Sequence, residues 1–246
     1  MIKYFNNNFS IINVYKKPSV VSELVTQMIY GDIFSIKTKK KKWLKIKIKN
    51  DKYEGYIKKK NFLPFSKPTH KVKTLKANIY RYHNKKKIIT KLSFGSRICV
   101  KSSKNKFFKF EKGWIEKKNL VLNSYKEKDV FKKAKLFLGT KYKWGGKTFK
   151  GIDCSALVQV CLNFNNKYCP RDSKDQMKFF KKEILYKNFI KNDLIFWKGH
   201  VAILASKKDI IHAYGPLKKT LIMGINYAIN RIKNTANLEV KSIKRV

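Results

Sequence analysis

Three residues in the C-terminal half of the chain have side chains suited to nucleophilic catalysis: Cys154, His200 and His212. Cys154 follows Asp153, and apolar residues recur at helical spacing after it, so we predict an amphipathic helix that begins at Cys154. The N–H groups at such a helix start stabilise a thiolate and can receive the oxyanion of an acyl transfer. A structural cysteine in a helix cap would show the same local pattern.

The two histidines are predicted to lie on neighbouring strands. A turn near Ser206 separates the segments that contain them, and an antiparallel hairpin centred there places His200 directly opposite His212. The pair then supplies a general base and a residue that orients it. We therefore expect a thiolate–imidazolium pair between Cys154 and His200. Two separate histidines of the protein core are the alternative.

The first half of the chain contains short runs in which apolar and polar residues alternate. They predict a small antiparallel barrel, with strands at 11–15, 33–36, 43–48 and 56–57. A second barrel follows, because Gly55-Tyr56-Ile57 recurs as Gly113-Trp114-Ile115. Helical spacing from Val130 to Leu138, ended by Gly139, then opens a third domain. The expected α+β chain has three domains, with limits at 1–65, 66–124 and 125–246.

The charge of the chain is extreme, since 59 Lys and Arg face 15 Asp and Glu, a net charge of +44. Such a balance raises nucleic acid or another polyanion as a partner. Lysines are spread from end to end, however, as a codon bias would produce, so we give binding of single-stranded nucleic acid little weight. Neither a leader nor a membrane span is evident, which predicts a cytoplasmic protein. The four cysteines lack the spacing of a zinc site, and the proposed chemistry needs no metal or cofactor.

Several motifs of the third domain resemble those of the NlpC family of papain-like cysteine peptidases. The matching segments are Tyr142, Trp144-Gly145-Gly146, Asp153-Cys154-Ser155, Pro170-Arg171-Asp172-Ser173, Asp193-Leu194-Ile195-Phe196-Trp197, Gly199-His200-Val201 and His212-Ala213. Both barrels resemble bacterial SH3-like domains. The whole chain is therefore similar to the dipeptidyl-peptidase branch of that family, which cleaves the γ-D-glutamyl–diamino acid bond of murein peptides that begin with a free L-Ala.

The resemblance implies that Cys154 attacks the γ-carbonyl, that His200 takes and returns the proton, and that His212 orients His200. It also implies that the side chain of Asp172 pairs with the free α-ammonium group of the substrate. Arg171 would neutralise the α-carboxylate of D-Glu or brace its own loop.

The remaining implied contacts line the substrate pocket. Asp153, Ser155 and Ser173 would hydrogen-bond the L-Ala-D-Glu portion of the peptide. Tyr142 and Trp144 would wall the acyl pocket; packing of the glycine-rich loop is the alternative role for both rings. Tyr30, before Gly31, matches the tyrosine with which the first SH3-like domain of this branch closes the pocket.

One position departs from the family pattern, because Ala156 stands where the family usually has glycine. The added methyl group favours the helix but could restrict the approach of substrate to the backbone. The expected function is hydrolysis of murein peptides in peptidoglycan turnover or recycling. The alternative is a cationic protein that binds cell wall or nucleic acid and keeps an inactive peptidase fold.

Overall fold

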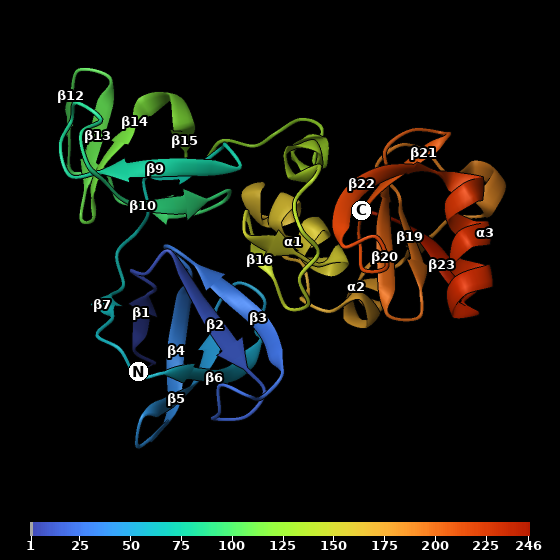
Figure 1. The fold of residues 1–246 in the computed structure, drawn as a ribbon, viewed down its shortest axis with the longest axis horizontal. Helices are drawn as coiled ribbons and strands as arrows, with labels where there is room; N and C mark the ends of the chain where they lie inside the picture. Colours follow the sequence, from blue (N-terminus) through green and yellow to red (C-terminus); the bar gives the residue numbers. More distant parts are fainter. Residues whose placement is uncertain (1) are drawn as a thin grey trace. The chain divides into compact units, whose positions relative to one another are not determined.

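The computed structural model describes residues 2–246, which form two compact units (Figure 1). The N-terminal unit runs to Lys126 and also includes Lys147–Phe149. The C-terminal unit comprises Glu127–Gly146 and Lys150–Val246. A short piece of the N-terminal unit therefore lies, in sequence, inside the C-terminal one.

The first part of the N-terminal unit is a single antiparallel sheet in the order β3-β2-β6-β5-β4-β1-β7. Its strands are β1 (Tyr4–Asn6), β2 (Ile11–Tyr15), β3 (Leu24–Ile29), β4 (Ile33–Lys40), β5 (Trp43–Ile48), β6 (Glu54–Lys58) and β7 (Leu63–Pro64). Inward-facing residues such as Val14, Phe34 and Ile46 fill the core of the sheet. The four strands predicted from alternation are β2, β4, β5 and β6.

Strand β3 was not predicted, because its residues do not alternate. Thr26 and Gln27 are as deeply buried as Met28 and Ile29, so polar side chains occupy positions that the pattern would give to apolar ones. A strand buried on both faces carries no period of two.

The second part of the N-terminal unit contains two sheets, in the orders β10-β9-β14-β13-β12 and β11-β8-β15. The elements are β8 (His70–Val72), β9 (Lys76–Tyr80), β10 (Ile88–Ser93), β11 (Arg97–Ile98), β12 (Ser102–Lys104), β13 (Phe107–Phe110), β14 (Gly113–Glu116), the 3₁₀ helix η1 (Lys117–Asn119) and β15 (Leu120–Leu122). The two copies of the Gly-aromatic-Ile repeat lie in β6 and β14. Tyr56 of β6 pairs with Tyr15, and Trp114 of β14 pairs with Tyr80.

The C-terminal unit is built on a six-stranded sheet in the order β18-β23-β19-β20-β21-β22. Its elements are the 3₁₀ helix η2 (Lys132–Phe137), β17 (Gly151–Ile152), α1 (Cys154–Phe164), α2 (Ser173–Phe179), β18 (Lys182–Glu183), the 3₁₀ helix η3 (Tyr186–Asn188), β19 (Leu194–Trp197), β20 (His200–Leu204), β21 (Asp209–Tyr214), β22 (Lys219–Gly224), α3 (Ile225–Ala236) and β23 (Ser242–Arg245). Strand β16 (Lys147–Thr148) belongs to the N-terminal unit. Helix α3 covers one side of the sheet, and α1 lies on the other (Figure 1).

Helix α1 begins at Cys154, as predicted, but it is not amphipathic. Its side chains are buried around the whole circumference, including Val158, Gln159 and Leu162 on the face expected to be polar. A helix that is buried all round is a core helix. Cys154 therefore stands at the end of the most buried helix of the unit.

The helix predicted from Val130 to Leu138 is a 3₁₀ helix, Lys132–Phe137. Phe131, Ala134 and Phe137 are all buried, and they are spaced by three residues. Positions i and i+3 coincide on a 3₁₀ helix, so this spacing suits three residues per turn better than 3.6. Gly139 follows with a φ of 76°, which ends the segment.

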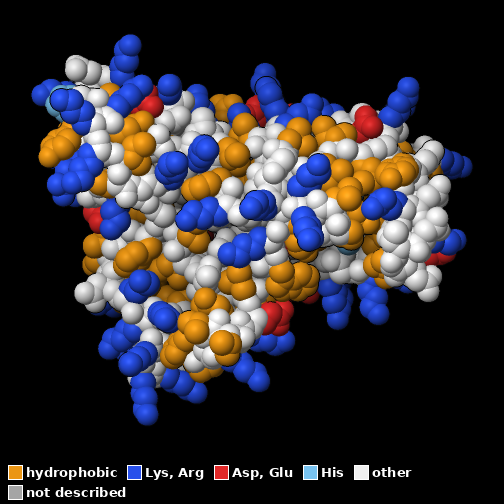
Figure 2. All heavy atoms as spheres, in the orientation of Figure 1, with side chains coloured by type: hydrophobic (Ala, Val, Ile, Leu, Met, Phe, Trp, Pro, Cys, Tyr) orange, Lys and Arg blue, Asp and Glu red, His pale blue; other side chains and the backbone are white. Residues whose placement is uncertain are grey.

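The basic side chains do not gather in one patch on the face that Figure 2 shows. Figure 2 shows Lys and Arg distributed across the visible face among separate carboxylates.

The longest helix among residues 2–246 is α3, with 12 residues, so none of the described helices has the length and apolar character needed to cross a membrane.

Candidate active site

Cys154 is the first residue of α1, and Asp153 caps that helix. The Asp153 carboxylate accepts a hydrogen bond from the backbone N–H of Ala156 at 2.8 Å. Cys154 itself is 5% exposed. Ala156 is fully buried, so its methyl group packs inside the protein and presents no surface to a ligand.

Burial raises the pKa of the Cys154 thiol to about 12, and the negative charge of Asp153 acts in the same direction. The backbone N–H groups of Val201 and Ser155 oppose this rise because they hydrogen-bond the sulfur. These contacts bring the start of β20 against the start of α1. Two main-chain donors thus point at the sulfur, where charge develops during attack on a carbonyl.

His200 and His212 are in direct contact. The distance from Nε2 of His200 to Nδ1 of His212 is 2.9 Å, and the ring of His212 stacks on Tyr214 with centroids 4.8 Å apart. The predicted register is wrong by two residues, since Ile203 lies opposite Ile211, whereas a hairpin centred on Ser206 would place it opposite Asp209. The rings meet even though the two histidines do not face each other directly.

Burial lowers the pKa of both histidines, to about 4 for His200 and about 3 for His212, and His200 adds to the effect on His212. Together with the raised pKa of Cys154, these shifts favour a neutral thiol beside a neutral imidazole. The thiolate–imidazolium pair expected from the sequence would have to form against both pKa shifts. We expect the proton to move when substrate is attacked.

The contact between the two rings defines where the protons must lie during catalysis. Nε2 of His200 is occupied by His212, which leaves Nδ1 as the nitrogen that can take a thiol proton. His200 must then donate Nε2–H to Nδ1 of His212, whose own proton lies on Nε2. That atom is buried and has no hydrogen-bond partner among residues 2–246, so this tautomer carries a cost of roughly 1–3 kcal/mol.

The lowered pKa values predict that acid destabilises the protein. Below pH 6.5 the unfolded chain binds a proton at His212, whereas the folded protein does so only near pH 3, so stability is lost as the pH falls through this window. For His212 alone we expect a loss of about 2 kcal/mol between pH 7 and pH 5. Urea unfolding at the two pH values measures it. In the variant His212→Gln the loss should shrink by that amount, and an identical loss in both proteins would contradict the assignment.

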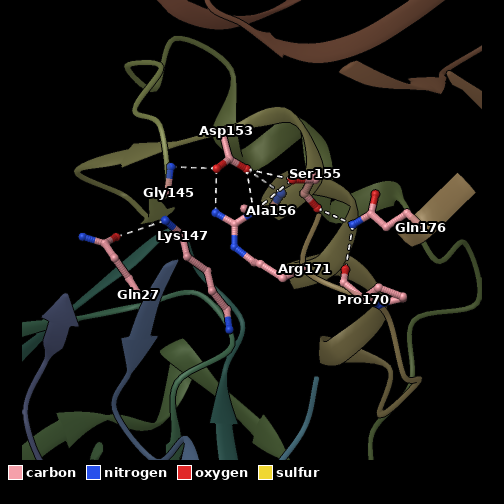
Figure 3. Close-up of polar contacts among 9 residues, drawn as sticks. All are labelled: Gln27, Gly145, Lys147, Asp153, Ser155, Ala156, Pro170, Arg171 and Gln176. Carbon is pink, nitrogen blue, oxygen red and sulfur yellow. Dashed lines mark hydrogen bonds and ion pairs between the residues drawn. The ribbon is translucent and has the colours of Figure 1, made fainter. Parts of the chain in front are cut away.

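A buried ion pair stands behind the helix cap (Figure 3). Nη2 of Arg171 lies 2.6 Å from one carboxylate oxygen of Asp153, and Nη1 lies 3.0 Å from the other. Nη1 also donates to the hydroxyl of Ser155 at 2.9 Å. Arg171 is 2% exposed and Asp153 is 5% exposed. Of the two roles considered for Arg171, bracing its own loop matches these contacts.

The glycine-rich loop is fastened to the same carboxylate. The N–H of Gly145 donates to Asp153 at 2.9 Å (Figure 3). The N–H of Asp153 in turn donates to the carbonyl of Gly146 at 3.3 Å. Gly145 has a φ of 68°, and a Cβ on Gly146 would lie 2.6 Å from the carbonyl oxygen of Gly151. Both glycines are needed for the close return of the chain.

Gln176 was not predicted as part of the site. Its amide donates to the backbone carbonyls of Ser155 and Pro170, both at 2.9 Å, and thereby ties α2 to α1 (Figure 3). It is fully buried. No local signal distinguishes a glutamine that bridges two backbones from one on the surface of a seven-residue helix, so only the fold identifies it.

The other predicted substrate contacts have different surroundings. Tyr142 is half-buried, and burial together with the nearby Cys154 raises the pKa of its phenol. Trp144 is 60% exposed. Asp172 and Ser173 are partly exposed, and Asp172 occupies the cap position of α2.

Tyr30 lies within the N-terminal unit and packs there. It is 7% exposed, its hydroxyl donates to Glu111 at 2.6 Å, and its ring meets Phe110 edge-on at 5.6 Å. This environment gives Tyr30 a packing role between β3 and the strands of the second barrel.

No group of three or more His, Cys, Asp or Glu side chains within residues 2–246 is arranged to hold a metal ion. The four cysteines carry free thiols. The chemistry available at the site is therefore that of the Cys154 sulfur, the two imidazoles and main-chain N–H groups.

Two family models match the chain. Residues 139–231 match the NlpC/P60 family, and residues 14–62 match the bacterial dipeptidyl-peptidase SH3 domain. Both matches agree with the resemblance found in the sequence motifs. They cover the loop, α1 and the histidine strands in one case and most of the first barrel in the other.

Relatives extend over both units. The chain is 26% identical over 230 residues to dipeptidyl-peptidase 6 of Lysinibacillus sphaericus, covering 82% of this chain and 84% of that protein. It is 23% identical to the gamma-D-glutamyl-L-lysine dipeptidyl-peptidase of Bacillus cereus (strain ATCC 10987 / NRS 248), covering 83% and 72%.

Solved structures share the fold. An NlpC/P60 family protein from Bacillus cereus ATCC 10987 superposes with a TM-score of 0.83 at 20% identity, covering 99% of both chains. An NlpC/P60 endopeptidase from Photobacterium damselae subsp. piscicida gives 0.67 at 13% identity, covering 98% of this chain and 70% of that one. The chain thus combines an NlpC/P60 domain with a bacterial dipeptidyl-peptidase SH3 domain, and it is a cysteine-type peptidase.

Proposed function

We propose that this peptidase hydrolyses the bond between γ-D-glutamate and the diamino acid in cell-wall peptides that begin with a free L-Ala, and that it releases L-Ala-D-Glu. The observation that carries the chemistry is the meeting of Cys154, at the start of α1, with the strand that begins at His200. The specificity is supported by relatives that match over four fifths of this chain and are named as dipeptidyl-peptidases, one of them for a γ-D-glutamyl-L-lysine bond.

The reaction would pass through a thioester. The Cys154 sulfur bonds to the γ-carbonyl carbon while His200 takes the thiol proton at Nδ1, and the oxyanion is received by the N–H groups of Ser155 and Val201. His200 then gives that proton to the amine of the leaving diamino acid, and the C–N bond breaks. Water, deprotonated by His200, hydrolyses the thioester and restores the thiol. His212 holds the ring of His200 throughout.

Substrate recognition is assigned to the partly exposed residues near this centre. We propose that Asp172 pairs with the free α-ammonium group of L-Ala, that Ser173 hydrogen-bonds the dipeptide, and that Tyr142 and Trp144 wall the acyl pocket. Asp153, Ser155 and Arg171 serve as supports of the nucleophile, because their polar groups bind one another.

Recognition of a free amine is tested with L-Ala-γ-D-Glu-diaminopimelate and its N-acetylated form, with products identified by mass. We expect release of L-Ala-D-Glu from the first peptide and at least about 100-fold slower cleavage of the second, because an ammonium–carboxylate pair is lost from a partly buried site. A matching peptide with L-lysine in the leaving position separates the two diamino acids.

Asp172→Asn should raise KM for the free peptide and abolish the preference over the acetylated one. Asp175→Asn is the matched control, since Asp175 lies one turn further along α2 and is exposed. Equal cleavage of the free and acetylated peptides by the wild type would exclude the proposed specificity while leaving the peptidase activity intact.

We further propose the three modules 1–65, 66–124 and 125–246, with the second as another SH3-like barrel. Two hydrophobic cores, the second of which also includes Tyr30, and the equivalent pairing of β6 and β14 support this division. We also propose that the enzyme serves turnover or recycling of free peptides in a reducing compartment such as the cytoplasm. The four free thiols, one of them the nucleophile, support such a setting.

A further inference from the structure

The segment Lys147–Phe149 leaves the catalytic unit and becomes part of the N-terminal unit. The backbone N–H of Lys147 donates to the side-chain oxygen of Gln27 at 3.0 Å (Figure 3). The ammonium group of Lys147 lies 3.7 Å from the carboxylate of Asp32, and these two side chains are only 3% and 4% exposed. A lysine from the loop before the nucleophile is thus buried in the first barrel.

The partners of Lys147 are themselves held in place by the barrel. The side-chain amide of Gln27, on β3, donates to Asn13 on β2 at 2.8 Å. The carboxylate oxygen of Asp32 that lies nearest Lys147 also accepts the N–H of Ile29 at 2.8 Å. The barrel therefore offers a preformed acceptor for the backbone of this segment and a preformed negative charge for its side chain.

The other end of the same loop is held by the helix cap of the nucleophile. Gly145, two residues before Lys147, donates to Asp153, and Asp153 in turn binds the carbonyl of Gly146. Asp153 precedes Cys154 directly and caps α1. Gly146, whose carbonyl accepts the N–H of Asp153, is bonded directly to Lys147, whose ammonium group faces Asp32.

We infer that Lys147 is a positioning residue for the peptidase reaction, which it serves by fixing the Gly145–Gly146 loop, and with it the Asp153 cap and the Cys154 sulfur, to the first barrel. The inference rests on the proposal that Cys154 is the nucleophile, but not on the identity of the peptide. A buried ion pair seldom adds much stability relative to apolar residues, but in some proteins it selects one arrangement of the chain. Here the arrangement selected is that of the loop before the nucleophile.

The test compares Lys147→Met, which keeps the length of the side chain and removes its charge, with Lys147→Arg, which keeps the charge. We expect Lys147→Met to lower kcat by about 10- to 100-fold with KM within about twofold of the wild type, because a small displacement of a reacting group has this effect. Lys147→Arg should recover most of kcat. Lys16→Met is the matched control, since Lys16 pairs with Glu23 on the surface of the same barrel, where the two side chains are 65% and 41% exposed.

A second readout needs no peptide. The rate of Cys154 alkylation by iodoacetamide at a fixed pH of about 8, followed by the mass of the peptide that contains Cys154, reports the surroundings of the sulfur. In Lys147→Met we expect this rate to fall by about tenfold, because the N–H groups at the start of α1 no longer hold their places beside the sulfur.

Asp32→Asn provides an independent variant in case Lys147→Met does not fold. It removes the charge facing Lys147 while leaving an oxygen for the N–H of Ile29, and we expect the same two changes from it. Wild-type values of both kcat and the alkylation rate in folded Lys147→Met or Asp32→Asn would overturn the inference. If no murein peptide is cleaved by the wild type, the alkylation rate alone decides the inference.

Discussion

Replacement of Cys154 by alanine is expected to lower turnover by at least about 10⁴-fold, the largest effect predicted for this protein. The variant has no atom that can form the thioester, and the remaining groups can only polarise the carbonyl. The N–H donors of Ser155 and Val201 stay in place, so a small residual rate above that of water is expected. Product release measured by mass at high enzyme concentration reports both rates.

Cys161→Ala is the matched control for this loss. Cys161 lies on the same helix, is 1% exposed and has a pKa that burial raises in the same way. Its side chain packs in the core, so the substitution should affect stability and leave turnover close to that of the wild type. If Cys154→Ala kept a tenth of the wild-type rate, or if Cys161→Ala lost as much, Cys154 would not be the nucleophile.

Arg171→Met should destabilise the protein by about 3–5 kcal/mol. The substitution leaves the Asp153 carboxylate buried without its cation, and the hydroxyl of Ser155 loses a donor. The backbone donors from Gly145 and Ala156 remain but carry no full charge. Chemical denaturation of both proteins under identical conditions gives the difference.

An exposed ion pair provides the control for Arg171→Met, because loss of its cation leaves no buried charge. Lys233 and Glu239 are 58% and 68% exposed and lie 2.9 Å apart. Lys233→Met should therefore change the free energy of unfolding far less than Arg171→Met does. Similar small effects of the two substitutions would mean that Asp153 does not depend on Arg171 for its charge.

The start of the nucleophile helix could be predicted to the residue because its signals are local. A capping side chain and the helical spacing that follows lie within a dozen positions of Cys154. The contact between the two histidine rings could be predicted, because both residues flank one short turn. The register was missed because nothing in the sequence of that turn fixes its centre, and a two-residue shift keeps the same side chains on the same face.

The supports of the site could not be predicted in this way. Asp153 and Arg171 are 18 positions apart, and Gln27 and Lys147 are 120 apart. A lysine in a chain with 59 basic residues gives no sign of being the buried one. Strand β3 was missed for a related reason, since its polar residues are buried through contacts with distant segments. The burial of these side chains depends on contacts with residues that are far away in the sequence.

The insertion of Lys147–Phe149 into the N-terminal unit also bears on how such a protein can evolve. A genetic exchange between Lys126 and Glu127 would supply a new barrel without the matching loop, because that loop is encoded downstream of the join. The incoming barrel would need its own acceptor and carboxylate at the places of Gln27 and Asp32. The first barrel and the peptidase are therefore expected to be inherited together and to change together, despite the modular order of the chain.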